Sequence, residues 1–123
     1  MYQQDYVLRQ IELFSQGIAR IFFHREQVSY SWPVSLTLYT RRDLWYRRVL
    51  LLLEEGKINA AENLLFEEMD SRDPRCLEAA LDFYARLAAL DEEQLDAAGF
   101  SREEIAQGLA DASRLFGVNI DGF

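Results

Sequence analysis

His24 is the only histidine in the sequence, and an imidazole is the side chain whose ordinary pKa lies nearest neutral pH. It follows a long helical pattern, where a cation interacts favourably with the dipole of the preceding helix. Glu26 could orient the ring, but no motif places a serine or cysteine nucleophile beside it. We therefore expect a capping or surface role for His24 and assign no catalytic residue.

Cys76 is the only cysteine, which excludes an intramolecular disulfide and a multi-cysteine zinc site. Arg75 could activate the thiol, but the apolar helical surroundings favour a buried side chain. Acidic residues also occur as consecutive pairs, and neighbours in a helix point about 100° apart, so a pair does not form one metal site. These pairs are Glu54/Glu55, Glu67/Glu68, Glu92/Glu93 and Glu103/Glu104. With no nucleotide-binding glycine motif either, we expect no metal and no cofactor.

Charge is distributed unequally along the 123 residues. Residues 1–50 hold seven arginines against four acids, whereas residues 51–123 hold six basic residues against seventeen acids. The acidic part repels phosphate backbones, so nucleic acid is not the expected partner. The four arginines that could contact it are Arg41, Arg42, Arg47 and Arg48.

Length and composition predict one helical domain over residues 1–123, because the chain is too short for two cores. The longest uninterrupted apolar run, residues 49–53, is far shorter than the roughly 20 residues of a membrane helix. The single cysteine and the absence of a targeting pattern favour the cytoplasm.

Residues 4–23 carry apolar side chains at alternating spacings of four and three, which predicts a long amphipathic helix. Its seam, which we expect to pack on neighbouring helices or on a second copy of the chain, comprises Val7, Ile11, Phe14 and Ile18. Residues 27–39 alternate instead and contain Pro33. Since no second strand could pair with this stretch, we predict an ordered loop whose aromatic residues pack on helices.

Capping residues then mark five further helices, which makes the predicted fold all-α with about six helices. Thr40 and Asp43 form a capping-box pattern, and Gly56 is expected to end the helix that they begin. The remaining helices are expected to begin at Asn59 with Glu62, Asp73 with Pro74, Asp91 with Gln94, and Ser101 with Glu104.

The hairpin centred on Gly56 resembles a tetratricopeptide repeat. The resemblance rests on Trp45, Leu52, Gly56, Ile58, Ala61 and Leu65. It implies two antiparallel helices, with a small residue at their close contact and a tryptophan in the groove between them. Stepping 34 residues onward yields Ala79, Arg86, Leu90 and Leu95, so the repeat does not recur. One such hairpin cannot bury its faces alone, and we expect the first helix and the C-terminal helices to cover it.

The whole chain also resembles an uncharacterised family from Firmicutes, in the segments DYVLRQIE, LLLEEGKINAAENLLFEE and FSREEIAQGL. That family is a domain of unknown function, so the resemblance implies a bacterial origin and a fold but transfers no catalytic motif.

These observations favour a non-catalytic protein–protein interaction module that binds a protein partner or itself. The candidate partner-binding residues around the hairpin are Tyr39, Tyr46, Arg47, Arg48, Asn59 and Asn63. A first alternative is a small enzyme or ligand-binding bundle with a pocket near His24, Tyr30 and Arg47. A second alternative is weak nucleic-acid binding through the basic N-terminal half.

Overall fold

The structure of the chain, a computed structural model, describes residues 2–23 and 29–118. These residues form α-helices and one short 3-10 helix and contain no strand, which confirms the all-α prediction. The helices are α1 (Tyr2–Phe23), η1 (Leu36–Leu38), α2 (Arg41–Glu54), α3 (Ile58–Glu68), α4 (Pro74–Ala88), α5 (Glu92–Ala97) and α6 (Arg102–Leu115).

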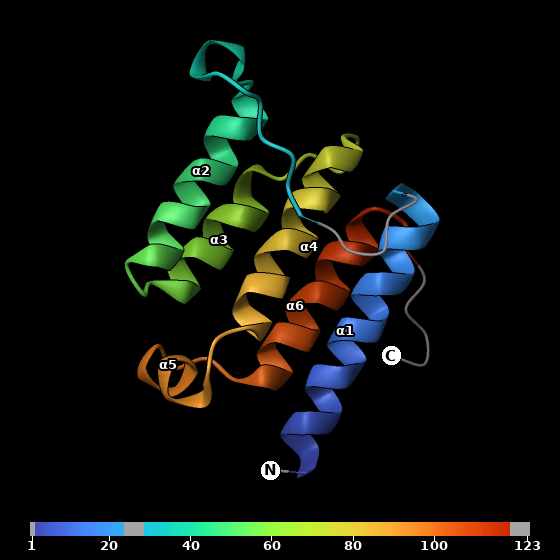
Figure 1. Cartoon of the computed structure of the whole chain (residues 1–123), viewed down its shortest axis with the longest axis vertical. Coiled ribbons are helices and arrows are strands. Elements are labelled where there is room, and N and C mark those ends of the chain that lie inside the picture. The colour runs from blue at the N-terminus through green and yellow to red at the C-terminus, as the bar shows by residue number, and fades with distance from the viewer. Residues whose placement is uncertain (1, 24–28, 119–123) are drawn as a thin grey trace.

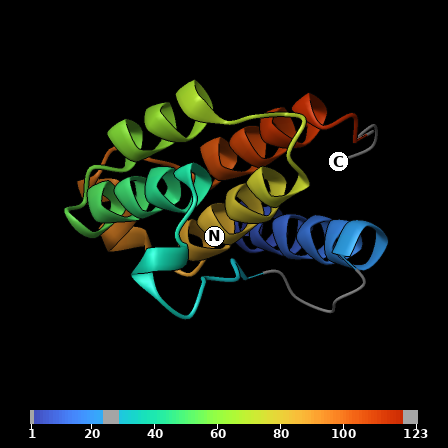
Figure 2. The same cartoon turned by 90° about the horizontal axis from the view of Figure 1, so that it is seen from above.

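Helix α4 lies in the middle of the fold, with α2 and α3 on one side and α1 and α6 on the other (Figures 1 and 2). The sequence of α4 explains this position, because ten of its 15 residues are buried. Among them are Leu77, Leu81, Phe83 and Leu87, each at most 2% exposed. An amphipathic helix at a surface buries only one stripe, so burial around most of α4 requires neighbours on both sides.

Helices α2 and α3 form the predicted antiparallel hairpin. Gly56 has φ of 77°, a conformation that side chains with a Cβ rarely adopt, and this residue turns the chain between the two helices. Ala61 is fully buried, and Nε1 of Trp45 donates a hydrogen bond to the Leu64 carbonyl at 3.0 Å. The tryptophan thus ties the two helices together across their groove.

The predicted helix starts are confirmed with one exception. Thr40 with Asp43 and Asp91 with Gln94 form complete capping boxes. Asp73 caps α4 ahead of Pro74, and Ser101 caps α6. The start expected at Asn59 is wrong, because α3 begins at Ile58 behind Lys57, whose side chain makes no capping hydrogen bond. The tight turn at Gly56 fixes this start without a polar cap.

Residues 29–39 form the predicted ordered loop with aromatic side chains packed on α2, while residues 27 and 28 lie outside the described part of the chain. The Trp32 ring stacks on Tyr46 of α2 with centroids 5.8 Å apart, and on Tyr39 with centroids 5.7 Å apart. Tyr30 packs edge-on against Trp32 at 4.7 Å. Aromatic contacts of this kind hold a loop that lacks a sheet partner.

None of the helices in residues 2–23 and 29–118 is both long enough and apolar enough to cross a membrane.

Candidate functional site

Tyr30 attaches the loop to the first turn of α2. Its hydroxyl donates to Oδ1 of Asp43 at 2.5 Å and accepts a hydrogen bond from Nε of Arg42 at 3.0 Å. Burial, together with the hydrogen bond to Asp43, raises the pKa of Tyr30 to about 12. Although burial opposes ionisation of Asp43, hydrogen bonds from Thr40 and Tyr30 hold the pKa of this carboxyl below its usual range. Asp43 is therefore a charged acceptor and Tyr30 a neutral donor at neutral pH.

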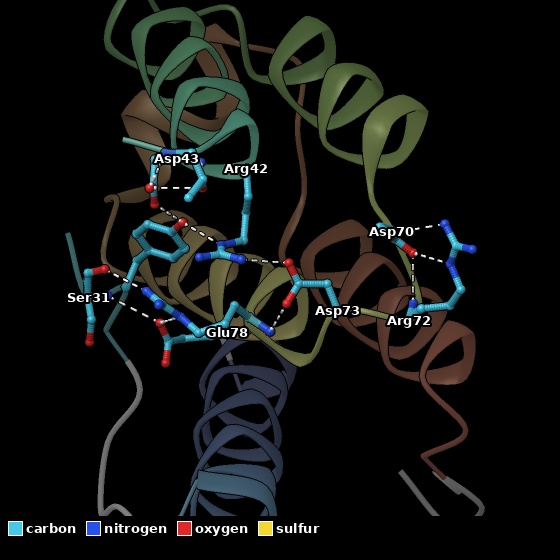
Figure 3. A network of polar contacts seen from close by, with 10 residues as sticks. Ser31, Arg42, Asp43, Asp70, Arg72, Asp73 and Glu78 are labelled. Atoms are coloured by element: carbon cyan, nitrogen blue, oxygen red, sulfur yellow. Dashed lines mark hydrogen bonds and ion pairs between the residues drawn. The ribbon is translucent and has the colours of Figure 1, made fainter. Parts of the chain in front are cut away.

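Arg42 continues the network from α2 to the start of α4 (Figure 3). Its Nη1 lies 2.7 Å from Oδ2 of Asp73, whose other oxygen accepts from the Arg75 backbone at 3.0 Å and caps α4. Burial by itself would lower the pKa of Arg42, but the hydrogen bonds to Asp73 and Tyr30 raise it. Asp73 thus caps one helix and forms an ion pair with another.

Glu78 and Arg75 of α4 hold the loop backbone at Ser31. Oε1 of Glu78 accepts from the Ser31 N–H at 3.2 Å and from Nε of Arg75 at 3.3 Å. Nη2 of Arg75 donates to the Ser31 carbonyl at 2.6 Å, and its guanidinium lies 5.2 Å from the centre of the Tyr30 ring. Both backbone polar groups of Ser31 are satisfied by side chains of one helix.

Asp82, only 5% exposed, joins the loop, α2 and α4. Its Oδ1 accepts from the Tyr30 backbone at 3.2 Å. Its Oδ2 accepts from the hydroxyl of Tyr46 and, at 2.8 Å, from Nε of Arg86. Burial, followed by the nearby Asp82 charge, raises the pKa of Tyr46. A buried carboxylate is tolerated here because three donors surround it.

The carboxylates of this polar network all accept hydrogen bonds from the chain itself, which makes the network a clamp that fastens residues 29–40 to α2 and α4. Residues 2–23 and 29–118 contain no group of three His, Cys, Asp or Glu arranged to hold a metal ion. Cys76 is 3% exposed, and burial raises the pKa of its thiol, as expected for a structural cysteine.

The surface of the molecule offers a different site on α2, which lies at the edge of the fold (Figure 1). Leu44 and Leu51 are 50% and 49% exposed, although leucine is among the most frequently buried residues. They line a hollow of about 580 Å³ with three arginines and one acid. We call this surface the α2 outer face, made of Arg41, Leu44, Arg47, Arg48 and Leu51, with Glu68 of α3 at its border.

A second hollow of about 380 Å³ adjoins the first, because Arg47 and Leu51 line both. Its other wall is formed by the loop residues Trp32 and Tyr39. The loop also carries Val34, Leu36 and Leu38, which are 97%, 65% and 59% exposed. The loop that the clamp holds in place therefore exposes apolar side chains of its own.

A family model described as a family of unknown function (DUF6483) matches residues 1–117. The chain belongs to this family. No curated protein and no solved structure matches the chain. The DUF6483 match includes the whole clamp and the whole α2 outer face.

The structure places the predicted partner-binding residues of this DUF6483 chain in three different settings. Arg47 and Arg48 lie on the α2 outer face, and Tyr39 lines the adjoining hollow. Asn59 and Asn63 are exposed on α3 and do not line either hollow. The expectation for Tyr46 is corrected, because this residue is fully buried and its hydroxyl binds Asp82.

The seam predicted for self-association is used within the DUF6483 chain. Ile11 and Ile18 are 1% and 3% exposed, and α1 packs against α4 and α6. Val7 and Phe14 are partly buried against the same core. Ile11 and Ile18 are therefore covered by their own chain and are not free to meet a second copy.

The pocket proposed around His24, Tyr30 and Arg47 is not assembled by the described residues. His24 lies outside them, Tyr30 is 5% exposed within the clamp, and Arg47 faces the surface hollows. Sequence reasoning also missed Leu44 and Leu51 as site residues. Leu44 and Leu51 are seven residues apart and so share one face of the helix, whereas buried Trp45 and Val49 lie on another face. This spacing was the indication in the sequence that α2 has two apolar faces.

Proposed function

We propose that residues 1–123 act as one cytoplasmic helical domain whose function is non-catalytic protein–protein interaction through the α2 outer face. The observation that carries this proposal is the pair of half-exposed leucines, Leu44 and Leu51, bordered by arginines. Apolar side chains surrounded by a polar rim are typical of protein-binding surfaces, and arginine is enriched in such surfaces. The resemblance of the α2–α3 hairpin to a tetratricopeptide unit supports the same assignment, whereas the resemblance of the chain to a Firmicutes family supports only a bacterial origin.

Nucleic-acid binding through the four arginines has less support. Arg42 forms an ion pair with Asp73, and Arg48 forms one with Glu68 at 2.7 Å. Of the four arginines, only Arg41 and Arg47 make no ion pair with a described residue. Binding to a phosphate backbone depends on the release of many counterions, which two unpaired cations do not provide. We therefore favour a protein partner.

Site-specific photocrosslinking tests the proposal. A photoreactive benzoylphenylalanine is placed at Leu44 or Leu51 of the full chain, and the protein is irradiated in native lysate. We expect a discrete crosslinked protein from both positions, identified by mass spectrometry. Leu13 and Leu115, which are 56% and 51% exposed on α1 and α6, are the matched control positions. Equal crosslinking from the control positions, or no discrete adduct from α2, would contradict the proposal.

A further inference from the structure

Five residues of α2 form an ordered pattern on its outer face. Leu44 and Leu51 are seven residues apart, so they lie about 20° apart around the helix axis, one above the other. Arg41 and Arg48 are also seven apart and lie together along one edge of this pair, whereas Arg47 lies along the opposite edge. The face is therefore an apolar stripe with cations on both sides.

The cations of this face are available to a partner. Arg41 and Arg47 make no ion pair with any described residue. Arg48 pairs with Glu68, but both side chains remain exposed, at 55% and 42%. An exposed pair of this kind contributes little to folding, so a carboxylate from a partner can replace Glu68 at small cost.

We propose that the α2 outer face binds an amphipathic α-helix that carries carboxylates on both edges of a leucine-like apolar stripe. This inference rests on the proposed function and names the chemistry of the partner. Opposite charge on the partner complements the arginines, and its apolar stripe covers Leu44 and Leu51.

The spacing of the two leucines favours a helix over an extended peptide. Residues seven apart in a helix are separated by about 10.5 Å along the axis, so positions i and i+7 of a partner helix match Leu44 and Leu51. Side chains on one face of an extended strand recur about every 6.7 Å, and neither one nor two such steps gives the same distance. A partner helix can place its positions i and i+7 against Leu44 and Leu51 whether it runs parallel or antiparallel to α2.

The overall charge of the chain disfavours two other occupants. With a net charge of −8, a second copy is repelled at long range, and so is a flat anionic membrane that extends beyond the arginines. A single helix is narrow enough to contact the cationic face alone. The hollow of about 580 Å³ has room for side chains of such a helix.

A designed peptide of 18 residues tests the inference with the full-length protein. The peptide carries leucines at heptad spacing with glutamates on both edges, and its control has lysine at every glutamate position. We expect the acidic peptide to bind, as measured by fluorescence anisotropy, and to shift backbone NMR signals of α2. The lysine peptide should not bind, and added salt should weaken the acidic complex.

Charge-reversal variants test whether the acidic peptide binds at the α2 outer face. The double variant Arg41→Glu/Arg47→Glu should weaken binding of the acidic peptide by about tenfold or more, because two attractive contacts become repulsive. Arg9→Glu, at an exposed position of α1, should leave the affinity unchanged. Leu44→Ser/Leu51→Ser should abolish binding, whereas Leu13→Ser should not. Circular dichroism melting establishes that each variant is folded.

Equal binding of both peptides, NMR shifts away from α2, or no binding of the acidic peptide would overturn the inference. Saturable binding to phosphatidylglycerol vesicles that exceeds peptide binding, or dimerisation through α2 in light scattering, would also overturn it. If photocrosslinking at Leu44 and Leu51 yields a partner while the acidic peptide does not bind, the interaction function stands and only the partner chemistry is wrong.

Discussion

The hydroxyl of Tyr46 on α2 donates a hydrogen bond to Oδ2 of Asp82 on α4, where both residues are buried. This pair joins the α2–α3 hairpin to the central helix. The same carboxylate holds the Tyr30 backbone, so one residue of α4 fixes both the hairpin and the loop before it. The position of the α2 outer face therefore depends on the contacts that Asp82 makes with Tyr46 and Tyr30.

Tyr46→Phe removes the hydroxyl and leaves the shape of the ring unchanged. We expect a loss of about 1.5–3 kcal/mol in the free energy of unfolding, because the lost hydrogen bond is made to a charged group. Urea denaturation followed by circular dichroism measures this loss. Tyr39→Phe is the control, since the Tyr39 hydroxyl has no hydrogen-bond partner among the described residues and its removal should change stability little. Equal effects of the two variants would contradict the role of Tyr46.

Gly108 of α6 leaves room for the side chains of Glu62 on α3 and Tyr84 on α4. A Cβ at Gly108 would lie 2.5 Å from Oε2 of Glu62 and nearer still to the hydroxyl of Tyr84. Gly108→Ala should therefore destabilise the protein by about 1–3 kcal/mol, even though alanine favours helix formation. Thermal unfolding measures the change.

Gly17 of α1 supplies the matched control for Gly108. A Cβ there would meet no atom within 4 Å, so Gly17→Ala should raise the stability by about 0.5–1 kcal/mol through helix propensity alone. A stabilising effect at both positions would show that the packing at Gly108 is looser than the structure gives.

Two helical serines with buried hydroxyl oxygens differ in their hydrogen bonds. Oγ of Ser113 donates to the Leu109 carbonyl at 2.8 Å, whereas the buried Oγ of Ser15 has no hydrogen-bond partner among the described residues. The free energy of unfolding should therefore be about 1 kcal/mol higher for Ser15→Ala than for Ser113→Ala, because only the second substitution gives up a hydrogen bond. Both substitutions bring the same gain in helix propensity, and chemical denaturation of the two variants gives the difference directly. A higher free energy of unfolding for Ser113→Ala than for Ser15→Ala would contradict these hydrogen-bond assignments.

Local helix punctuation could be predicted from the sequence because the responsible contacts are short in range. The capping box of Thr40 with Asp43, and the turn at Gly56, involve residues within a few positions of one another. Their chemistry is complete before any tertiary contact forms. The start of α3 was missed because the competing constraint, the turn after Gly56, displaced the polar cap expected at Asn59.

The candidate site could be predicted only in part, because exposure is a tertiary property. Helix α2 carries large apolar side chains on more than one face, and the residues alone do not say that Tyr46 turns inward while Leu44 and Leu51 turn outward. The answer depends on Asp82, which lies 36 residues after Tyr46. Arg47 and Arg48, which were among the predicted partner-binding residues, are exposed because their charge resists burial.

Glu62 makes the stability of the fold depend on pH. Its Oε2 accepts from the Tyr84 hydroxyl at 2.6 Å. Burial raises its pKa, the Tyr84 hydrogen bond opposes this change, and the negative charges of Glu104 and Asp111 add to it. A carboxyl with a raised pKa in the folded state binds its proton more tightly there than in the unfolded chain. Its stabilising contribution is therefore present at low pH and is lost as the pH rises through its folded pKa.

Glu62→Gln isolates this contribution, because glutamine keeps an oxygen acceptor for Tyr84 and carries no charge. We expect the free energy of unfolding of the variant, minus that of the wild type, to be larger at pH 7 than at pH 4, because only the wild type loses stability as Glu62 ionises. Urea denaturation at both pH values measures the difference. Glu67→Gln, at an exposed position of the same helix, corrects for the general effect of removing one negative charge. If Glu62→Gln and Glu67→Gln show the same pH dependence, the burial of Glu62 does not control its ionisation.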